Sequence, residues 1–337
     1  MSDQLEARYR RLLAWYPWEH RRVYEEEMLG VLMAGARPGQ RYPRLTDAAN
    51  LLVSAGGRRL GVAVRGLAGV EWRDAAAVVG LLGALLLLGL RLHPYGRALA
   101  VEWWSDEEPR IIVSGGPAPR LAFWFLVTAA ALLGLRRTAA IVAWPAVAWE
   151  TALAVLRFPS EAGDVIGSMW PYLLAVLTAA ALTVPATRHR ARTLLGGRGL
   201  ALAGAGVLVA AAAPVVSLLI GGRPEGGSYV FTAGLMMTAL SACYLAGGAL
   251  VAMAVWRLAA PVRRRVVVLF APVIVVQLVI EQWFSGWRHS TSAPVPAQWA
   301  VLVLTPALTF AVGVAVVRWR EERERLIALG RAADRAT

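Results

Sequence analysis

The sequence has no lysine and a single cysteine, and both shortages narrow its chemistry. All 35 basic residues are arginine, which we interpret as a coding bias toward GC-rich codons rather than a functional choice. The lone Cys243 leaves no second thiol in this sequence for an internal disulfide or a thiolate metal site. Charged residues make up 17% of the chain, well below the share in ordinary soluble domains.

Signature motifs of the common catalytic and metal sites are also missing. The sequence contains neither the glycine-rich P-loop pattern of nucleotide hydrolases nor the His-Glu-x-x-His pattern of zinc proteases. The four histidines fall on both sides of the predicted membrane topology, so we expect no shared metal site: His20, His93, His189 and His289. We therefore predict no enzyme, no cofactor and no metal.

Long apolar runs dominate what is present. Hydrophobic residues reach 58%, and residues 75–90 contain no polar side chain at all. With its flanks this run approaches the ~20 residues that cross a bilayer as a helix. Seven further runs follow, so the predicted fold is an all-α membrane bundle of eight transmembrane helices at about 75–92, 121–135, 139–157, 169–186, 199–220, 229–256, 266–284 and 299–317.

The loops between these runs predict their orientation. Three alternate loops carry arginine and no acid, which is typical of cytoplasmic loops; their residues are Arg136, Arg137, Arg188, Arg190, Arg192, Arg198, Arg257, Arg263, Arg264 and Arg265. The other loops carry acids among fewer arginines, and these acids are Glu102, Asp106, Glu107, Glu108, Glu161, Asp164 and Glu225. We predict a protein of the cytoplasmic membrane with both termini in the cytoplasm, and we attribute the net charge of +13 to this orientation rather than to nucleic-acid binding.

The first 72 residues differ from the rest, because they are charged and patterned as short helices. Tyr9, Leu12, Leu13 and Tyr16 share one face of a helix over 3–16, and Tyr16-Pro17 ends it. A second helix over 18–34 and a third from Thr46 follow. The predicted domains are a three-helix cytoplasmic module at 1–72, a membrane domain at 73–318 and a cytoplasmic C-terminal helix at 319–337.

This N-terminal module resembles a known group of sequences. The residues that carry the resemblance are Tyr9-Arg10-Arg11-Leu12-Leu13, Tyr16-Pro17, Arg21-Arg22, Glu26-Glu27-Met28-Leu29, Arg37-Pro38-Gly39 and Arg44. They are similar to the helical module of high-GC bacterial multi-pass membrane proteins, including orphan ABC-type permeases and HAAS-like signalling proteins encoded beside PadR-type repressors. The resemblance implies a module that binds a regulatory protein in the cytoplasm through Tyr16, Pro17, Arg21, Arg22, Glu26, Glu27 and Met28. The same charged residues are also typical of a solvated helix face.

Two functions stay open at this point. One is a membrane-anchored regulator or sensor, whose spans respond to the envelope or the lipid bilayer while the module binds a cytoplasmic partner. The other is a transporter or permease subunit that uses the module for docking. The spans contain few ionisable groups, which favours the regulator.

Glu150 is the exception within the spans. It lies 13 residues beyond Arg137 in an otherwise apolar run, and an acid at that depth is costly unless it faces a partner or a water-filled site. Gln277, at a matching depth, and Arg157, two turns along the same helix, are the predicted partners. Small residues at Gly234, Thr238, Ala242 and Ala246 separately predict a face of close helix packing.

The predicted topology can be tested with reporter fusions. Fusions at 105 and 227 should report the outer side of the membrane, and fusions at 192 and 260 the cytoplasmic side, because the acid-free arginine loops stay inside. A reversed signal at any of the four positions would reject the eight-span topology.

Overall fold

The protein is described here from a computed structural model. The residues it describes are 2–16, 18–37, 40, 42–44, 46–48, 50–51, 54, 69–104, 117–167, 169–185, 191–221, 229–283 and 295–334. Within these ranges every regular element is a helix, which confirms the all-α class. The chain divides into two compact units, Met1–Gly69 and Val70–Thr337, and the division lies close to the domain boundary expected after residue 72.

The first unit is built around a helical hairpin. Helices α1 (Ser2–Leu13) and α2 (Trp18–Ala34) pack together, and the described residues at 46–48, 50, 51 and 54 are helical as well. The rest of the predicted third helix lies outside the described residues. The core consists of Leu5, Tyr9, Leu13, Tyr16, Leu29 and Leu51.

Burial of the Tyr9 ring has a chemical consequence in this unit. It raises the pKa of the phenol, and the neighbouring Asp47 carboxylate raises it further. The Tyr9 hydroxyl therefore keeps its proton and donates a hydrogen bond of 3.4 Å to Asp47.

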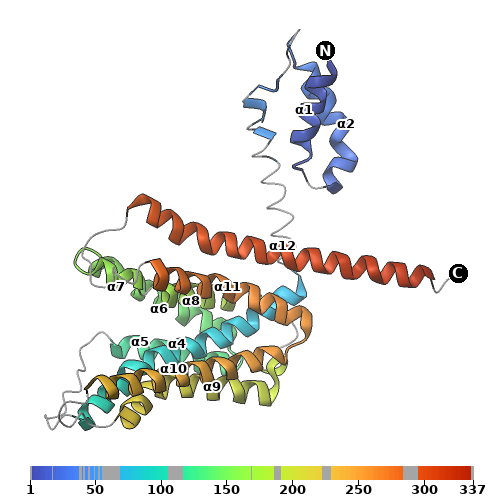
Figure 1. Cartoon of the computed structure of the whole chain (residues 1–337). Coiled ribbons are helices and arrows are strands. Elements are labelled where there is room, and N and C mark those ends of the chain that lie inside the picture. The colour runs from blue at the N-terminus through green and yellow to red at the C-terminus, as the bar shows by residue number, and fades with distance from the viewer. Residues whose placement is uncertain are drawn as a thin grey trace. The chain divides into compact units, whose positions relative to one another are not determined.

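The second unit is a bundle of long helices (Figure 1). Its elements are α4 (Val70–Trp104), α5 (Pro117–Leu132), α6 (Arg136–Arg157), α7 (Ala162–Gly167), α8 (Met169–Thr183), α9 (Ala191–Gly221), α10 (Tyr229–Trp256), α11 (Ala260–Trp283) and α12 (Pro296–Asp334). Among the described residues, six helices are long and apolar enough to cross a membrane: α4, α6, α9, α10, α11 and α12. Helices α5 and α8 are apolar but shorter. These helices indicate a multi-pass membrane protein.

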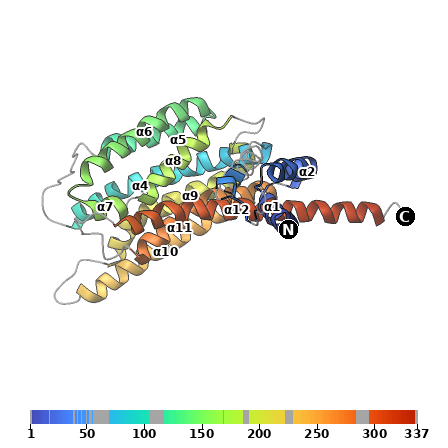
Figure 2. The same ribbon diagram turned by 90° about the horizontal axis from the view of Figure 1, so that it is seen from above.

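Helix α4 forms the centre of this unit. It packs against α5, α8, α9 and α11, and it lies between its neighbours in both views (Figures 1 and 2). Residues 75–82 of α4 are buried without a break. A helix that is apolar on every face is one that is covered on every face. The run that stands out in the sequence is therefore the core of the bundle.

A tight turn joins α5 to α6. Gly134 has φ +79°, a conformation that side chains disfavour. Its N–H donates to the Ala131 carbonyl at 3.1 Å, and the Leu135 N–H donates to the Ala130 carbonyl at 2.8 Å. This pair of bonds is the Schellman arrangement that ends a helix. It reverses the chain, so that α6 returns antiparallel to α5.

Helices α9 and α10 approach each other most closely at two glycines. A methyl group added at Gly206 would lie 2.5 Å from the Gly247 carbonyl oxygen, and one added at Gly247 would lie 2.6 Å from the Gly206 carbonyl oxygen. The small-residue face predicted for this span was wrong, since Gly234, Thr238, Ala242 and Ala246 are all exposed. Gly247 lies one residue beyond that predicted face and turns toward α9.

The last helix is longer than the predicted span. Helix α12 continues without interruption from Pro296 to Asp334, so the last apolar run and the C-terminal charged segment form one element rather than two. It packs along α11 and extends beyond the ends of the neighbouring helices (Figures 1 and 2).

The glycine contact between α9 and α10 predicts that alanine destabilises the protein at Gly247 but not at the neighbouring Gly248. Gly247→Ala should lower the free energy of unfolding by about 1–3 kcal/mol, because its methyl group would overlap backbone that cannot easily move away. Gly248→Ala is the matched control, since nothing lies within 4 Å of a methyl group there. Thermal unfolding of the purified proteins in detergent measures the difference, and equal midpoints for the two variants would contradict the packing described.

Candidate ligand-binding site

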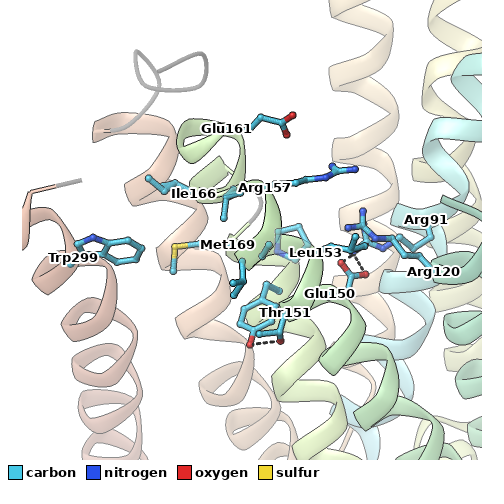
Figure 3. A pocket seen from close by; sticks show the side chains of 15 residues that line it. Arg91, Arg120, Glu150, Thr151, Leu153, Arg157, Glu161, Ile166, Met169 and Trp299 are labelled. Atoms are coloured by element: carbon cyan, nitrogen blue, oxygen red, sulfur yellow. Dashed lines mark hydrogen bonds and ion pairs between the residues drawn. The ribbon is translucent and has the colours of Figure 1, made fainter. Parts of the chain in front are cut away.

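A cavity of about 410 Å³ opens at one end of the bundle. Residues of α4, α5, α6, α7, α8 and α12 line it, and the lining residues of α6 belong to its last two turns. Figure 3 shows the cavity with the charged groups of Arg91, Arg120 and Glu150 on one side and the side chains of Met169 and Trp299 on the other.

Two arginines share one carboxylate in this cavity. Arg91 Nη2 lies 2.5 Å from Glu150 Oε1, and Arg120 Nε lies 3.6 Å from Glu150 Oε2. The side chain of Arg91 is 19% exposed, that of Arg120 is 21% exposed and that of Glu150 is 10% exposed. A carboxylate with so little water would be costly alone, and the two guanidinium groups offset that cost.

The order of the helices explains why these three residues meet. Arg91 is the first charged residue after the apolar run of α4, and Arg120 lies in the first turn of α5. Glu150 lies 14 residues beyond the start of α6 at Arg136. Since α4 and α6 both run toward the cavity and α5 runs away from it, all three charges reach the same end of the bundle.

Arg157 and Glu161 complete the charged lining. Both are exposed, and in Figure 3 the Arg157 side chain extends toward Arg91 and Arg120. The lining therefore has three arginines and two glutamates. One positive charge is left over.

The other wall of the cavity is apolar apart from one hydrogen-bonded pair. The Thr151 and Tyr172 hydroxyls lie 3.0 Å apart, while Ile166, Met169 and Trp299 contribute carbon and sulfur atoms. The cavity thus combines a cationic wall with an apolar one. That combination suits a ligand with an anionic head and an apolar body.

The partners predicted for Glu150 need correction. The described hydrogen bonds and ion pairs join Glu150 to Arg91 and Arg120 instead, while the Gln277 side-chain amide donates to Glu281 at 2.9 Å. Gln277 lies on α11, which contributes no residue to the lining of the cavity. Arg157 shares the cavity with Glu150 but is not paired with it.

A second charged cluster lies at the other end of the bundle. The Arg265 side chain, 5% exposed, forms ion pairs with Glu71 of α4 and with Glu321 of α12 at 2.5 Å. Arg264 pairs with Glu324 at 2.8 Å. The sequence analysis assigned Arg264 and Arg265 to a cytoplasmic loop and residue 321 to the C-terminal helix at 319–337. The charge pattern of these two segments does not reveal that α11 and α12 bring their side chains together.

Nearby, Arg136 closes the last turn of α8. Its Nη2 donates to the Ala181 carbonyl at 2.5 Å, and its Nε donates to the Leu182 carbonyl at 3.2 Å. Carbonyls at a helix C-terminus have no partner within the helix, so a cation placed there satisfies them. This places the end of α8 beside the start of α6, at the end of the bundle opposite the cavity.

Some of the partner-binding residues predicted in the N-terminal module belong to its core, and others lie on its surface. Tyr16 is buried, and Met28 packs against the core. Glu26 pairs with Arg10 at 2.8 Å, which ties α2 to α1 and raises the pKa of the Arg10 guanidinium. The others are Arg21, whose Nη1 lies 4.0 Å from Glu25 Oε2, exposed Arg22 and exposed Glu27; Pro17 lies outside the described residues.

Two general findings bear on the chemistry of the site. The described part of the chain holds no group of three or more His, Cys, Asp or Glu side chains placed to bind a metal ion. Comparisons with family models, curated proteins and solved structures find no match to this chain.

A double-mutant cycle tests the shared carboxylate. Combining Arg91→Gln with Glu150→Gln should give a coupling energy of about 0.5–3 kcal/mol, the range for residues in contact. The same cycle with Arg157→Gln is the control and should give a value near zero, since Arg157 is not paired with Glu150. Unfolding in detergent supplies the free energies, and equal coupling in both cycles would contradict the ion pair.

Proposed function

We propose that the protein is an eight-span membrane protein with both termini in the cytoplasm. The positions of α5 and α8 support eight spans rather than six. Helix α5 returns the chain from the cavity, where Arg120 lies, to the start of α6 at Arg136. Helix α8 likewise leads from Tyr172 in the cavity to the Leu182 carbonyl beside Arg136. Each short helix thus runs between the level of the cavity and the level of Arg136, as α6 does.

Within this membrane body we assign a sensory role rather than transport. The observation that carries this assignment is that the cavity lies at one end and the centre of the bundle is packed with apolar side chains. Buried residues of α4 such as Val78, Leu81 and Leu82 occupy that centre. A substrate pathway requires polar or ionisable groups along its length.

The buried hydroxyls do not provide such a pathway. Thr178 donates to the Leu174 carbonyl and Ser217 to the Pro214 carbonyl, each within its own helix. The Thr128 hydroxyl lies 2.7 Å from the Trp124 carbonyl of its own helix and 3.1 Å from the Ala84 carbonyl of α4. Among the described residues, these buried hydroxyls are thus satisfied by nearby backbone carbonyls. They do not link the cavity with the Arg265 cluster.

Two helices connect the cavity with the far end, and they supply a route for a signal. Helix α4 carries Arg91 in the cavity and Glu71 in its first turn, about 30 Å away at 1.5 Å per residue. Helix α12 carries Trp299 in the cavity and Glu321 further along. Arg265 binds both glutamates. A ligand that shifts α12 against α4 would therefore strain this bridge.

The N-terminal module is the proposed output. In the sequence it precedes α4, whose first turn holds Glu71, and its exposed Glu27 lies on a surface that a cytoplasmic regulatory protein can reach. The resemblance of its helices to modules found beside repressors agrees with a protein partner. We expect no direct contact with nucleic acid.

A genetic experiment separates sensing from transport. In a strain that lacks the native gene, the full chain should restore the transcript profile, whereas residues 70–337 alone should not, because the sensor has lost its output. Arg120→Gln should shift the profile, and Arg137→Gln, at the opposite end of α6, should not. Membrane levels of each variant are checked by immunoblot. Full restoration by residues 70–337 would contradict a sensor and favour transport.

A further inference from the structure

We propose that the cavity binds one anionic lipid through a singly charged phosphodiester headgroup, with part of the acyl chain against the apolar wall. This inference rests on the proposed function in one respect, that the cavity is the ligand site. It adds the chemical class of the ligand.

The unused hydrogen-bond donors of the cavity call for an anion. A guanidinium has five N–H donors. Arg91 gives one hydrogen bond to Glu150, and Arg120, at 3.6 Å from the same carboxylate, gives none within 3.5 Å to any described residue. The Nε–H groups of both are buried without an acceptor among the described residues. Paired arginines with free N–H groups match the oxygens of a phosphate better than any neutral ligand does.

The charge balance selects the charge of the headgroup. Three arginines face two glutamates in the lining, so one negative charge completes it. A phosphodiester carries one charge, whereas a terminal phosphate carries between one and two near neutral pH. A zwitterionic headgroup would bring a cation into a site that already holds one in excess, which disfavours it.

The apolar wall and the position of the cavity argue for a lipid over a soluble phosphate. Ile166, Met169 and Trp299 offer the ligand only nonpolar surface and one indole edge, and Phe158 packs its ring 5.9 Å from Trp299. The cavity also lies where α6 ends at Arg157 and α8 and α12 begin, which is where a spanning helix meets the headgroup layer. Tryptophan and arginine are typical of that layer.

Native mass spectrometry of the purified full chain in detergent tests the proposal. Titration with dioleoylphosphatidylglycerol should show one lipid bound per chain at low lipid concentration, with dioleoylphosphatidylcholine bound at least about ten-fold more weakly. Arg120→Gln should weaken phosphatidylglycerol binding by about ten-fold, the loss expected for one charge-assisted contact. Arg157→Gln is a second variant that should also weaken phosphatidylglycerol binding. It removes an exposed arginine of the cavity and leaves the ion pairs of Glu150 in place.

The matched control is Arg137→Gln. Arg137 is exposed on the same helix as Arg157 but at the opposite end, so this variant removes the same charge and should bind the lipid as the wild type does. Equal binding of the two lipids, or equal weakening by Arg137→Gln, would overturn the proposal and indicate nonspecific attraction to the arginine-rich chain.

Two further probes identify the source of the anion. Glycerol phosphate should not displace phosphatidylglycerol at similar concentration, and oleate should compete only weakly. Displacement of phosphatidylglycerol by glycerol phosphate would contradict the proposal that the ligand is a lipid. Binding of oleate more strongly than phosphatidylglycerol would contradict the proposal that the headgroup is a phosphodiester. If neither lipid binds while residues 70–337 still fail to restore the transcript profile, this inference fails and the sensory function stands.

Discussion

The Glu150 carboxylate, shared by Arg91 and Arg120, holds the ends of α4, α5 and α6 together around the cavity. One carboxylate neutralises one guanidinium, so the arrangement keeps positive charge in a place with little water. Such a group persists when an ion pair, a ligand or both offset its desolvation. The ion pair explains why the cluster is tolerated in the protein, and the surplus charge explains what it can bind.

The two ends of the bundle differ in their charge and in their open volume. The cavity end has surplus donors and an open volume. At the other end, Arg265 pairs with the two carboxylates of Glu71 and Glu321, and Arg136 caps α8. Helix α4 joins the two ends through a fully buried apolar core, and α12 joins them along α11. In the function that we propose, packed helices transmit a displacement between sites because close-packed interiors do not deform smoothly.

The all-α class and the apolar helices of this fold could be predicted from the sequence, because the length of an apolar run is a local property of the chain. Glu150 could also be recognised as a site residue, since an acid is conspicuous in an apolar helix. Its partners could not, because Arg91 and Arg120 come from other helices and their approach depends on how the bundle packs. The same limit explains the error at α10. Periodicity locates a face of small residues, but Gly247, one residue away, is the glycine that meets Gly206.

A structure of the full chain determined in phosphatidylglycerol nanodiscs, compared with one in phosphatidylcholine nanodiscs, would show whether the cavity holds an anionic lipid beside Glu150. We expect Arg91 and Arg120 on either side of Glu150 in both structures, with headgroup density among Arg91, Arg120 and Arg157 in phosphatidylglycerol alone. Glu150 paired with neither arginine, or a cavity free of lipid in both membranes, would contradict this expectation.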